Sequence, residues 1–196
     1  MLEVLRRLDT AVYRGVARLP TPGLDVPLRR LSDFADFSKL WLTIAGLLVL
    51  LGGRRGRRAA LTGVAAIGGA SFLVNQPMKL THLRRRPDRE GAEVPQARWA
   101  HMPTSTSFPS GHSASAAAFC VAVGDVVPEL ALPVRALGGT VAFSRVYTGV
   151  HYPGDVAVGV VAGAMVGRLA SDAGRRLAAR RARSRTVSRR IGPASA

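Results

Sequence analysis

Nearly uncharged apolar runs alternate with blocks of arginine along this chain, and that alternation restricts the folds it can adopt. The apolar runs cover residues 40–53, 59–78, 102–124, 131–144 and 156–167, and Arg135 alone interrupts them with a charge. Residues 59–78 are long enough to cross a bilayer as a helix. The other runs suit a bundle in which shorter helices pack against one another. The pattern predicts an all-α, integral-membrane helical bundle with about five transmembrane helices.

The arginine blocks give the chain its charge. Lys+Arg number 28 and Asp+Glu 12, for a formal net charge of +16. Such a balance is also typical of nucleic-acid-binding proteins. However, 47% of the residues are hydrophobic and only 6% are aromatic, so surfaces on which bases could stack are scarce. Arginine blocks beside apolar segments, such as residues 54–58, instead follow the positive-inside rule. We therefore expect a membrane protein with no nucleic-acid partner.

The N-terminal region has a different pattern. Apolar residues recur at three- and four-residue steps from Leu2 to Leu19, and most arginines lie between them. This spacing predicts an amphipathic helix, which either lies on the membrane surface or packs on the domain as an ordinary surface helix. We expect residues 1–36 to form an amphipathic interfacial segment, residues 37–173 the transmembrane domain, and residues 174–196 a basic, flexible tail.

Small residues at helical spacing predict close contacts between helices. Gly159, Gly163 and Gly167 form one ridge, and Ala65 and Gly69 form a shorter one. A glycine inside a helix costs roughly 1 kcal/mol relative to alanine, so a glycine ridge indicates a packing role. The sequence leaves open whether the longer ridge contacts a helix of the same bundle or another subunit, and the oligomeric state is open as well.

Three clusters of polar and basic residues stand at the ends of the apolar runs. They are Lys79 with Arg86-Pro87, then Pro109-Ser110-Gly111-His112, then Ser144-Arg145 with His151 and Asp155. If consecutive transmembrane helices alternate in direction, all three clusters lie at the same end of the bundle. The sequence therefore predicts one site built from all three.

The basic residues of these clusters are suited to phosphate. Arg86 and Arg145 carry planar guanidinium groups that match phosphate oxygens, and Lys79 adds a point charge. Ser110 and Gly111 open a helix, where free backbone N–H groups favour an anion, although Ser110 also suits a simple helix N-cap. We expect these five residues to bind the phosphate of a substrate.

Two of the four histidines have catalytic surroundings. Asp155 follows His151 by one helical turn, where a carboxylate can fix the tautomer of an imidazole that attacks phosphorus. His112 would protonate the departing alkoxide. His82 and His101 have no such neighbours, and we interpret them as loop residues that could touch a headgroup.

A metal site is the competing interpretation, because His112, His151 and Asp155 could form a facial triad. The basic residues of the three clusters would surround such a cation with positive charge. We therefore expect neither a metal nor another cofactor.

The three clusters resemble, in order and spacing, the signature of the type 2 phosphatidic acid phosphatase superfamily. The matching residues are Lys79-x6-Arg86-Pro87, Pro109-Ser110-Gly111-His112 and Ser144-Arg145-x5-His151-x3-Asp155, within about residues 40–171. The resemblance implies a metal-independent phosphatase of a membrane lipid phosphate. It further implies a phosphohistidine on His151, Asp155 as the partner of that ring, and His112 as general acid. The phosphoryl oxygens would be held by Lys79, Arg86, Ser110, Gly111 and Arg145.

The resemblance also narrows the substrate. The short chain and compact loops are most similar to bacterial phosphatases of polyprenyl phosphates or pyrophosphates, including enzymes that dephosphorylate decaprenyl-phosphoryl-phosphoribose for cell-wall arabinan. Phosphatidate and phosphatidylglycerophosphate phosphatases are alternatives, and Arg84, Arg85, Arg86 and Arg89 could suit a headgroup with two phosphates. A non-catalytic membrane protein that binds anionic lipids is the alternative from another class.

The arginine blocks also predict an orientation. A cytoplasmic C-terminal tail places residues 54–58 inside as well, as the positive-inside rule prefers. We therefore expect a multi-pass protein of the plasma membrane with its active site on the extracytoplasmic face.

Overall fold

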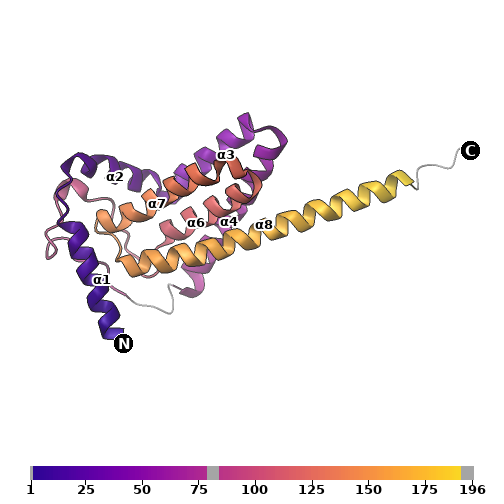
Figure 1. Ribbon diagram of the computed structural model, residues 1–196. Helices are drawn as coiled ribbons and strands as arrows, with labels where there is room; N and C mark the ends of the chain where they lie inside the picture. The colour runs from indigo at the N-terminus through magenta and orange to yellow at the C-terminus, as the bar shows by residue number, and fades with distance from the viewer. Residues whose placement is uncertain (1, 79–83, 191–196) are drawn as a thin grey trace, which may run out of the picture.

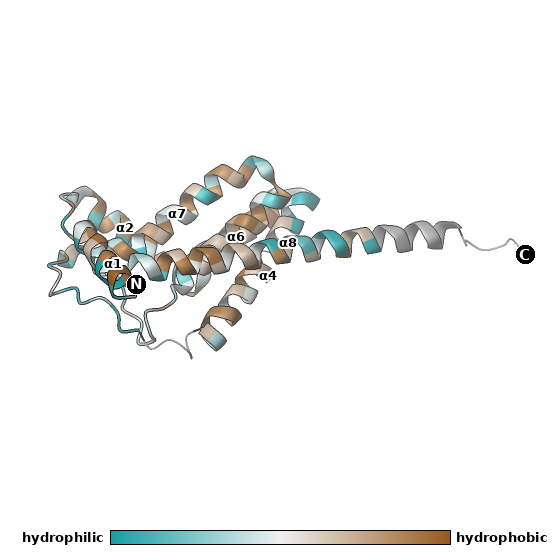
Figure 2. Cartoon of the chain, turned by 60° about the horizontal axis from the view of Figure 1, so that its bottom comes forward, coloured by the Kyte–Doolittle hydropathy of each residue, from teal (hydrophilic) through white to brown (hydrophobic). Residues whose placement is uncertain are grey.

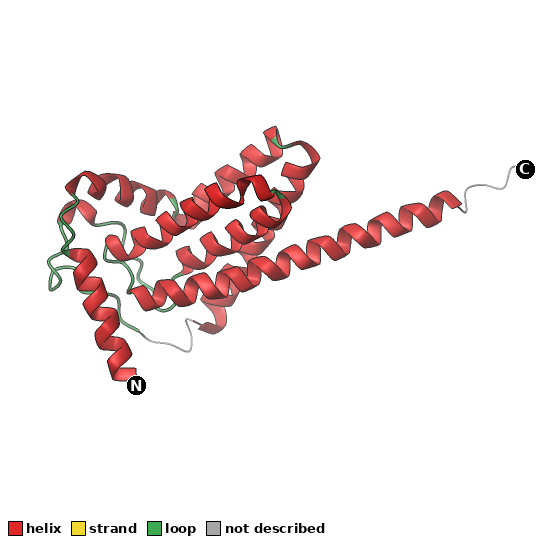
Figure 3. Cartoon of the chain, in the orientation of Figure 1, coloured by secondary structure: helices red, strands yellow, loops and turns green. Residues whose placement is uncertain are grey.

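The computed structural model describes residues 2–78 and 84–190, and all regular structure in these ranges is helical (Figure 3). The α-helices are α1 (Leu2–Ala17), α2 (Pro22–Phe34), α3 (Lys39–Leu51), α4 (Gly53–Leu73), α6 (Gly111–Val126), α7 (Ala131–Tyr147) and α8 (Pro153–Arg190). Short helical turns are η1 (Asp36–Ser38), η2 (Val74–Met78), η3 (Gln96–Arg98) and η4 (Pro128–Leu130). The prediction of an all-α fold is confirmed.

Helix α6 lies at the centre of the bundle. Helices α4, α7 and α8 pack along it, and α3 packs on α4 (Figure 1). Between these helices the core contains fully buried Trp41, Phe119, Val123 and Val141. The rings of Trp41 and Phe119 lie 5.3 Å apart between centroids. Much of the remaining buried surface of α6 is alanine and serine, which lets neighbouring backbones approach closely.

The predicted glycine ridge is the contact surface of α8 with α6. An added Cβ would lie 2.5 Å from the carbonyl oxygen of Ser110 at Gly159, 2.0 Å from that of Ala114 at Gly163, and 2.6 Å from that of Ala118 at Gly167. No side chain fits at such distances, so the two helices meet backbone to backbone. The ridge therefore serves a contact within the bundle.

The shorter ridge was predicted only in part. Gly69 faces α8, where an added Cβ would lie 2.9 Å from the side chain of Val166. Ala65 is exposed, whereas a Cβ added at Gly63 would lie 2.8 Å from the ring of Phe119. Helix α4 therefore contacts its neighbours through Gly63 and Gly69. The prediction that Ala65 makes a close contact between helices is wrong.

Three helices of the bundle are shorter than isolated membrane spans. Within the described ranges, only Pro153–Arg180 of α8 is long and apolar enough by itself, with a mean hydropathy of 1.4. The pair Pro22–Phe34 and Asp36–Leu51, bent by 67°, also qualifies if it counts as one span. The five expected helices are present as α3, α4, α6, α7 and α8, but α3, α6 and α7 have 13, 16 and 17 residues.

The boundary between the first two of these helices differs from the prediction. Helix α4 begins at Gly53 and contains the arginines of residues 54–58, which we expected to lie between two helices. An arginine side chain is compatible with helical backbone, so a block of them does not end a helix. The turn is made one residue earlier, where Gly52 and Gly56 approach the carbonyl of Leu48 too closely for any side chain.

The predicted N-terminal helix is present as α1. Its apolar residues Val4, Leu5, Leu8 and Val12 are each more than half exposed, while Tyr13 is buried. The buried side belongs to a small cluster with residues of the 84–110 loop and of α7. An exposed apolar stripe on a helix that packs at the edge of the bundle is suited to a membrane surface, and its interfacial location stays a prediction.

The predicted segment boundaries are not breaks in the chain. Near residue 36 the chain continues from α2 through η1 into α3, with Phe37 and Ser38 both in the left-handed region at φ 54° and 58°. At the other end, α8 runs past residue 174 to Arg190 and projects beyond the bundle (Figure 1). We expected a flexible tail there and find helix, because alanine, leucine and arginine after residue 174 are good helix formers. Helix α8 is apolar along the bundle and more polar beyond it (Figure 2).

The backbone contact between α6 and α8 predicts the effect of a single methyl group. Gly163→Ala should lower the free energy of unfolding by about 1–3 kcal/mol or prevent folding, because the Cβ would meet the carbonyl of Ala114. Gly139→Ala is the matched control, since it lies inside α7 with nothing within 4 Å of the added Cβ. It should be neutral or stabilise by up to about 1 kcal/mol. Thermal unfolding in detergent measures both, and equal effects of the two substitutions would contradict the contact.

Candidate active site

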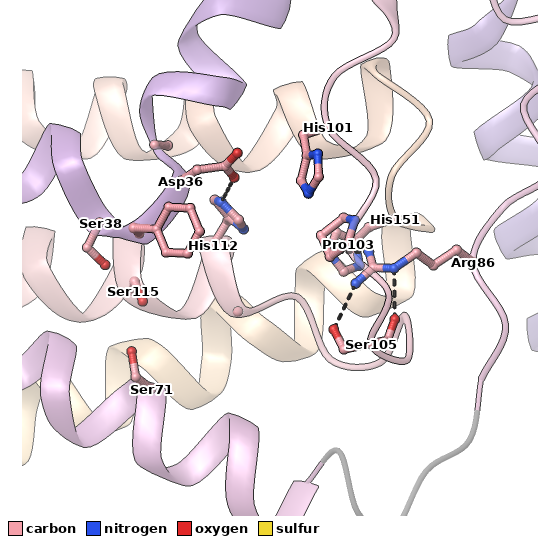
Figure 4. Close-up of a pocket in the computed structure, with 13 residues that line it drawn as sticks. Asp36, Ser38, Ser71, Arg86, His101, Pro103, Ser105, His112, Ser115 and His151 are labelled. Carbon is pink, nitrogen blue, oxygen red and sulfur yellow. Dashed lines mark hydrogen bonds and ion pairs between the residues drawn. The ribbon is translucent and has the colours of Figure 1, made fainter.

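A cavity of about 310 Å³ lies at the end of the bundle where α6 begins and α4 ends (Figure 4). Its walls come from η1, α4, the loop before α6, the first turns of α6 and the loop before α8. The lining residues are Ala35, Asp36, Phe37, Ser38, Ser71, Arg86, His101, Pro103, Ser105, Gly111, His112, Ser115 and His151. One member of each predicted cluster, namely Arg86, His112 and His151, therefore lines the same cavity.

The end of α7 and the start of α8 hold His151 in the cavity wall. Its backbone N–H donates to the carbonyl of Arg145 at 3.0 Å, and the residue is only 2% exposed. The Nε2 atom lies 3.2 Å from Nη1 of Arg86. Because a guanidinium group can only donate, Nε2 is the acceptor in this contact, and the ring proton is on Nδ1. The lone pair of His151 therefore faces the side of the cavity occupied by Arg86.

The ring of His151 is uncharged at neutral pH. Burial lowers its pKa to about 3, and the positive charges of Arg145 and Arg86 act in the same direction. The negative charge of the nearby Asp155 carboxylate opposes these effects without overcoming them. A neutral imidazole keeps the lone pair that a nucleophile requires.

A serine hydroxyl contacts both His151 and Asp155. The Oγ of Ser107 donates to Oδ2 of Asp155 at 2.5 Å and lies 3.4 Å from Nδ1 of His151. The direct separation between Nδ1 of His151 and Oδ2 of Asp155 is 3.7 Å, longer than a hydrogen bond. The Ser107 oxygen can therefore accept a hydrogen bond from the Nδ1–H of His151 while its own proton is donated to Asp155. The hydroxyl links the carboxylate to the ring in this way. The sequence analysis missed Ser107, because no fixed spacing links it to the third cluster.

Asp155 is itself fixed by several donors. Its Oδ1 accepts from Nη1 of Arg84 at 2.8 Å, and its Oδ2 accepts from the backbone N–H of Tyr152 at 3.0 Å. The Nη2 of Arg84 donates to Asp9 of α1 at 2.6 Å, and its guanidinium group lies 4.1 Å from the ring centroid of Tyr152. A carboxylate with this many donors stays in one orientation.

The suggestion that neighbouring arginines serve a second phosphate is wrong for Arg89, and Arg84, which lines a pocket with Arg85 and Arg86, already pairs with two carboxylates. Arg89 is buried and donates to the backbone carbonyls of Gly149 and Ala100. The sequence does not predict these positions, because Arg84 and Arg89 belong to one basic run whose composition is typical of an exposed loop.

Arg86 is the guanidinium group in the cavity wall. It donates to the backbone carbonyls of Ser105, Thr106 and Val150 and to the hydroxyl of Ser105, at distances of 2.9 to 3.3 Å. Burial lowers its pKa to about 10, so it is charged at neutral pH. These carbonyls fix the plane of the group beside His151 (Figure 4).

Asp36 is the partner of His112. Its Oδ1 lies 2.6 Å from Nε2 of His112 (Figure 4). Burial tends to raise the pKa of Asp36, but the hydrogen bond and charge of His112, with the charge of Arg145, lower it overall. Asp36 is therefore ionised at neutral pH, and it stabilises the protonated form of the imidazole. The sequence analysis missed Asp36 and placed it in the N-terminal segment, since it precedes His112 by 76 positions.

Arg145 lies behind the cavity wall. It is completely buried, and its Nη1 donates to the hydroxyl of Ser32 at 2.5 Å. Within the described part of the chain its Nε and Nη2 atoms are buried and have no hydrogen-bond partner. Buried donors without acceptors are rare in native proteins, so two of them on one guanidinium group indicate a place for an anion.

The remaining predicted phosphate ligands have different positions. Gly111 lines the cavity, whereas Ser110 is fully buried and caps α6 by accepting from the backbone N–H of Ser113 at 3.4 Å. The backbone N–H of Ser110 donates to the carbonyl of Asp155 at 3.0 Å. Lys79 and His82 lie outside the described residues. His101, which we interpreted as a loop residue, is exposed and lines the cavity.

In residues 2–78 and 84–190 no three His, Cys, Asp or Glu side chains are grouped as a metal site would require. The two carboxylates beside the histidines already have partners. Asp155 pairs with Arg84, and Asp36 pairs with His112. A mechanism without metal stays a prediction, which chelation tests below.

Comparison with known proteins places this geometry in a family. Residues 59–177 match the model of the PAP2 superfamily. The chain is 35% identical over 176 residues to the decaprenylphosphoryl-5-phosphoribose phosphatase of Mycobacterium tuberculosis, covering 89% of this chain and 95% of the relative. It is 28% identical over 167 residues to the lipid A 1-phosphatase of Rhizobium johnstonii, covering 76% of this chain and 67% of that protein.

Two crystal structures share the fold. LpxE of Aquifex aeolicus superposes with a TM-score of 0.67 at 22% identity, over 83% of this chain and 94% of that one. A transmembrane PAP2-type phosphatidylglycerolphosphate phosphatase of Bacillus subtilis superposes with a TM-score of 0.66 at 22% identity, over 88% and 87%. The chain belongs to the PAP2 superfamily. It is a phosphatase of lipid phosphates.

The buried, neutral His151 predicts how stability depends on pH. Its pKa in the folded protein lies below the ordinary value of 6.5, so the unfolded chain takes up this proton first as the pH falls. The stability that His151 contributes should therefore be complete above about pH 6.5 and decline toward pH 3. His151→Asn should make the melting temperature less dependent on pH between pH 6.5 and 4. His101→Asn, at an exposed site, should leave the pH dependence of the melting temperature as in the wild type. A slope that is unchanged in His151→Asn would contradict the neutral, buried ring.

Proposed function

We propose that this protein removes the phosphate from a polyprenyl-linked sugar phosphate, and that decaprenylphosphoryl-5-phosphoribose is its substrate. The observation that carries the chemistry is the unprotonated Nε2 of His151, 3.2 Å from Arg86 in the wall of the cavity that also contains His112. The substrate is supported by two mycobacterial relatives named decaprenylphosphoryl-5-phosphoribose phosphatase, of which the match covers 95% and 72%. The product would be a polyprenyl-linked ribose for the assembly of cell-wall arabinan.

The first step is transfer of the phosphoryl group to His151. The Nε2 lone pair forms the bond to phosphorus as the bond from phosphorus to the C5 oxygen of ribose breaks. His112 gives its proton to that oxygen, so the sugar leaves as an alcohol. The Nη1 donor of Arg86, which faces Nε2 in the resting protein, is positioned to pass to a phosphoryl oxygen.

The second step returns the enzyme to its resting state. A water molecule attacks the phosphohistidine, the bond between phosphorus and Nε2 breaks, and inorganic phosphate leaves. His112, which lost its proton in the first step, accepts one from the attacking water. The positive charge that His151 carries while phosphorylated is stabilised by Asp155, through Ser107 and directly.

We further propose that α3, α4, α6, α7 and α8 cross the plasma membrane as one bundle, with α1 on its surface. Support comes from the fold shared with a transmembrane phosphatase and from the apolar length of α8. The arginines of residues 54–58 begin α4 at the end of the bundle away from the cavity. The positive-inside rule puts that end in the cytoplasm, which leaves the cavity on the extracytoplasmic face.

Purified full-length protein tests the substrate and the chemistry together. It should release phosphate from decaprenylphosphoryl-5-phosphoribose with a higher kcat/KM than from phosphatidate or phosphatidylglycerophosphate. His151→Ala should abolish release, orthovanadate should inhibit by mimicking five-coordinate phosphorus, and EDTA should have no effect. A preference for a glycerophospholipid would refute the substrate, and inactivation by EDTA that divalent metal reverses would refute the metal-free mechanism.

Asp36 extends the predicted site, and we propose that it keeps His112 protonated and oriented for the first step. It acts through His112 and so is a positioning residue. Asp36→Asn keeps the shape but removes the negative charge, and it should lower kcat roughly tenfold to a hundredfold. The alkaline limb of the kcat profile should move to lower pH, because the protonated ring loses its partner.

Two comparisons separate this role from a structural one. A substrate with an activated leaving group such as p-nitrophenyl phosphate should be much less affected by Asp36→Asn, since it needs little protonation. Asp33→Asn is the control from the same segment, whose carboxylate accepts from the backbone N–H of His101. Equal loss on both substrates, or an unmoved pH profile, would remove Asp36 from the proposed mechanism.

A further inference from the structure

A second polar cavity, of about 440 Å³, lies among α4, α6 and α8. It is lined by Arg54, Arg55, Arg58 and Thr62 of α4, by Asp125 and Val126 at the end of α6, and by Ser171 and Arg175 of α8. Four guanidinium groups thus meet a single carboxylate. The arrangement has an excess of positive charge that the cavity does not balance.

The carboxylate is already neutralised. Both oxygens of Asp125 accept from Nη1 of Arg168, at 3.0 and 2.9 Å, and Arg175 lies 3.8 Å away. Arg55 donates to the carbonyl of Val126 and pairs with Glu129. In the ranges that the structure describes, the guanidinium groups of Arg54 and Arg58 have neither a hydrogen bond nor an ion pair. These two groups are therefore open to an outside anion.

A buried hydroxyl points to the same conclusion independently. Ser171 is only 2% exposed, and its Oγ is buried without a hydrogen-bond partner in the described part of the chain. A buried polar atom in that state is unfavourable unless something outside the protein bonds to it. Thr62, across the cavity, donates to the carbonyl of Arg58 and so does not serve Ser171. The cavity therefore offers an unused hydroxyl beside two unused guanidinium groups.

This cavity is separate from the active site. The catalytic cavity includes Gly111 and His112 at the start of α6, whereas this one includes Asp125 and Val126 at its end. At 1.5 Å per residue, the length of α6 puts about 24 Å between the two ends. In a membrane-spanning bundle, the second cavity lies at the surface of the opposite leaflet.

The surroundings of the cavity favour a lipid over a soluble anion. Leu61 on α4 and Leu169 on α8 flank the lining residues and are 73% and 66% exposed. Leu50 and Leu51 at the end of α3, just before the arginines, are 78% and 82% exposed. Acyl chains would contact this apolar surface while a phosphate group contacts the guanidinium groups.

We propose that this cavity binds the phosphate headgroup of an anionic phospholipid in the leaflet opposite the active site. Arg54 and Arg58 donate to the phosphate oxygens, and the hydroxyl of Ser171 bonds to the headgroup. The lipid connects α4 with α8 at the end of the bundle that is distant from catalysis. The proposal depends on the membrane-embedded fold and is independent of the substrate proposed above.

Matched pairs of substitutions test it in the full-length protein. Arg54→Gln with Arg58→Gln removes two charges from the cavity. Arg57→Gln with Arg176→Gln removes one charge from α4 and one from α8, at residues that do not line the cavity. Native mass spectrometry and thermal unfolding with added phosphatidylglycerol measure binding, and phosphatidylcholine and inorganic phosphate are the comparison ligands. Thermal unfolding without lipid and phosphatase activity report the fold of each variant.

We expect phosphatidylglycerol to bind and to raise the melting temperature of the wild type and of the Arg57/Arg176 variant. The cavity variant should lose on the order of tenfold or more in affinity, because it lacks two charge-assisted contacts. Ser171→Ala should weaken lipid binding while leaving the lipid-free melting temperature unchanged or higher.

Three results would overturn the proposal. Equal losses in the two double variants would show that the basic surface binds lipid without a site. Equal binding of phosphatidylcholine would show that the anionic headgroup is not recognised. Inorganic phosphate that binds as tightly as phosphatidylglycerol would identify a soluble anion as the ligand. Each can occur while phosphatase activity persists, so failure here is distinguishable from failure of the proposed function.

Discussion

The backbone contact between α6 and α8 is the constraint on which the site depends. Gly159 lies over the carbonyl of Ser110, and the N–H of Ser110 donates to the carbonyl of Asp155. The start of α6, which carries His112, is thereby held against the start of α8, which follows His151. Side chains at Gly159 or Gly163 would push the two helices apart, and the two histidines would no longer share a cavity. In this fold the glycines that permit close helix packing also set the distance between His151 and His112.

Electrostatics then gives the two histidines opposite properties. His151 is enclosed by protein and faces arginines, so it is neutral and keeps a lone pair. His112 is partly exposed and faces an ionised carboxylate, which favours the protonated form. One ring therefore has a free lone pair and the other is favoured in its protonated form, and these are the properties that the proposed mechanism requires of them. The buried, unpaired nitrogen atoms of Arg145 complete a site arranged for the charge of a phosphoryl group.

Features that recur at fixed spacing could be predicted from the sequence, whereas contacts between distant segments could not. The glycine ridge follows from helical periodicity, and the meeting of Arg86, His112 and His151 at one cavity follows from alternation of helix direction. Asp36 and Ser107 could not be predicted, because their contacts depend on how η1 and a long loop fold over the start of α6. The roles of Arg84 and Arg86 could not be separated either. The two stand two positions apart, yet one pairs with Asp155 and the other lines the cavity.

The ion pairs of Arg84 make the N-terminal helix a structural part of the active site. Asp9 of α1 accepts from Arg84 and from the backbone N–H of Gly154, the residue before Asp155. Arg84 in turn holds Asp155. Two partly buried ion pairs thus connect an amphipathic helix with Asp155, the carboxylate beside His151. Because such pairs are far less screened than surface ones, a displacement of α1 from the bundle would leave Arg84 and Asp155 with altered partners. The segment that would contact the membrane surface therefore also holds residues of the candidate active site in place.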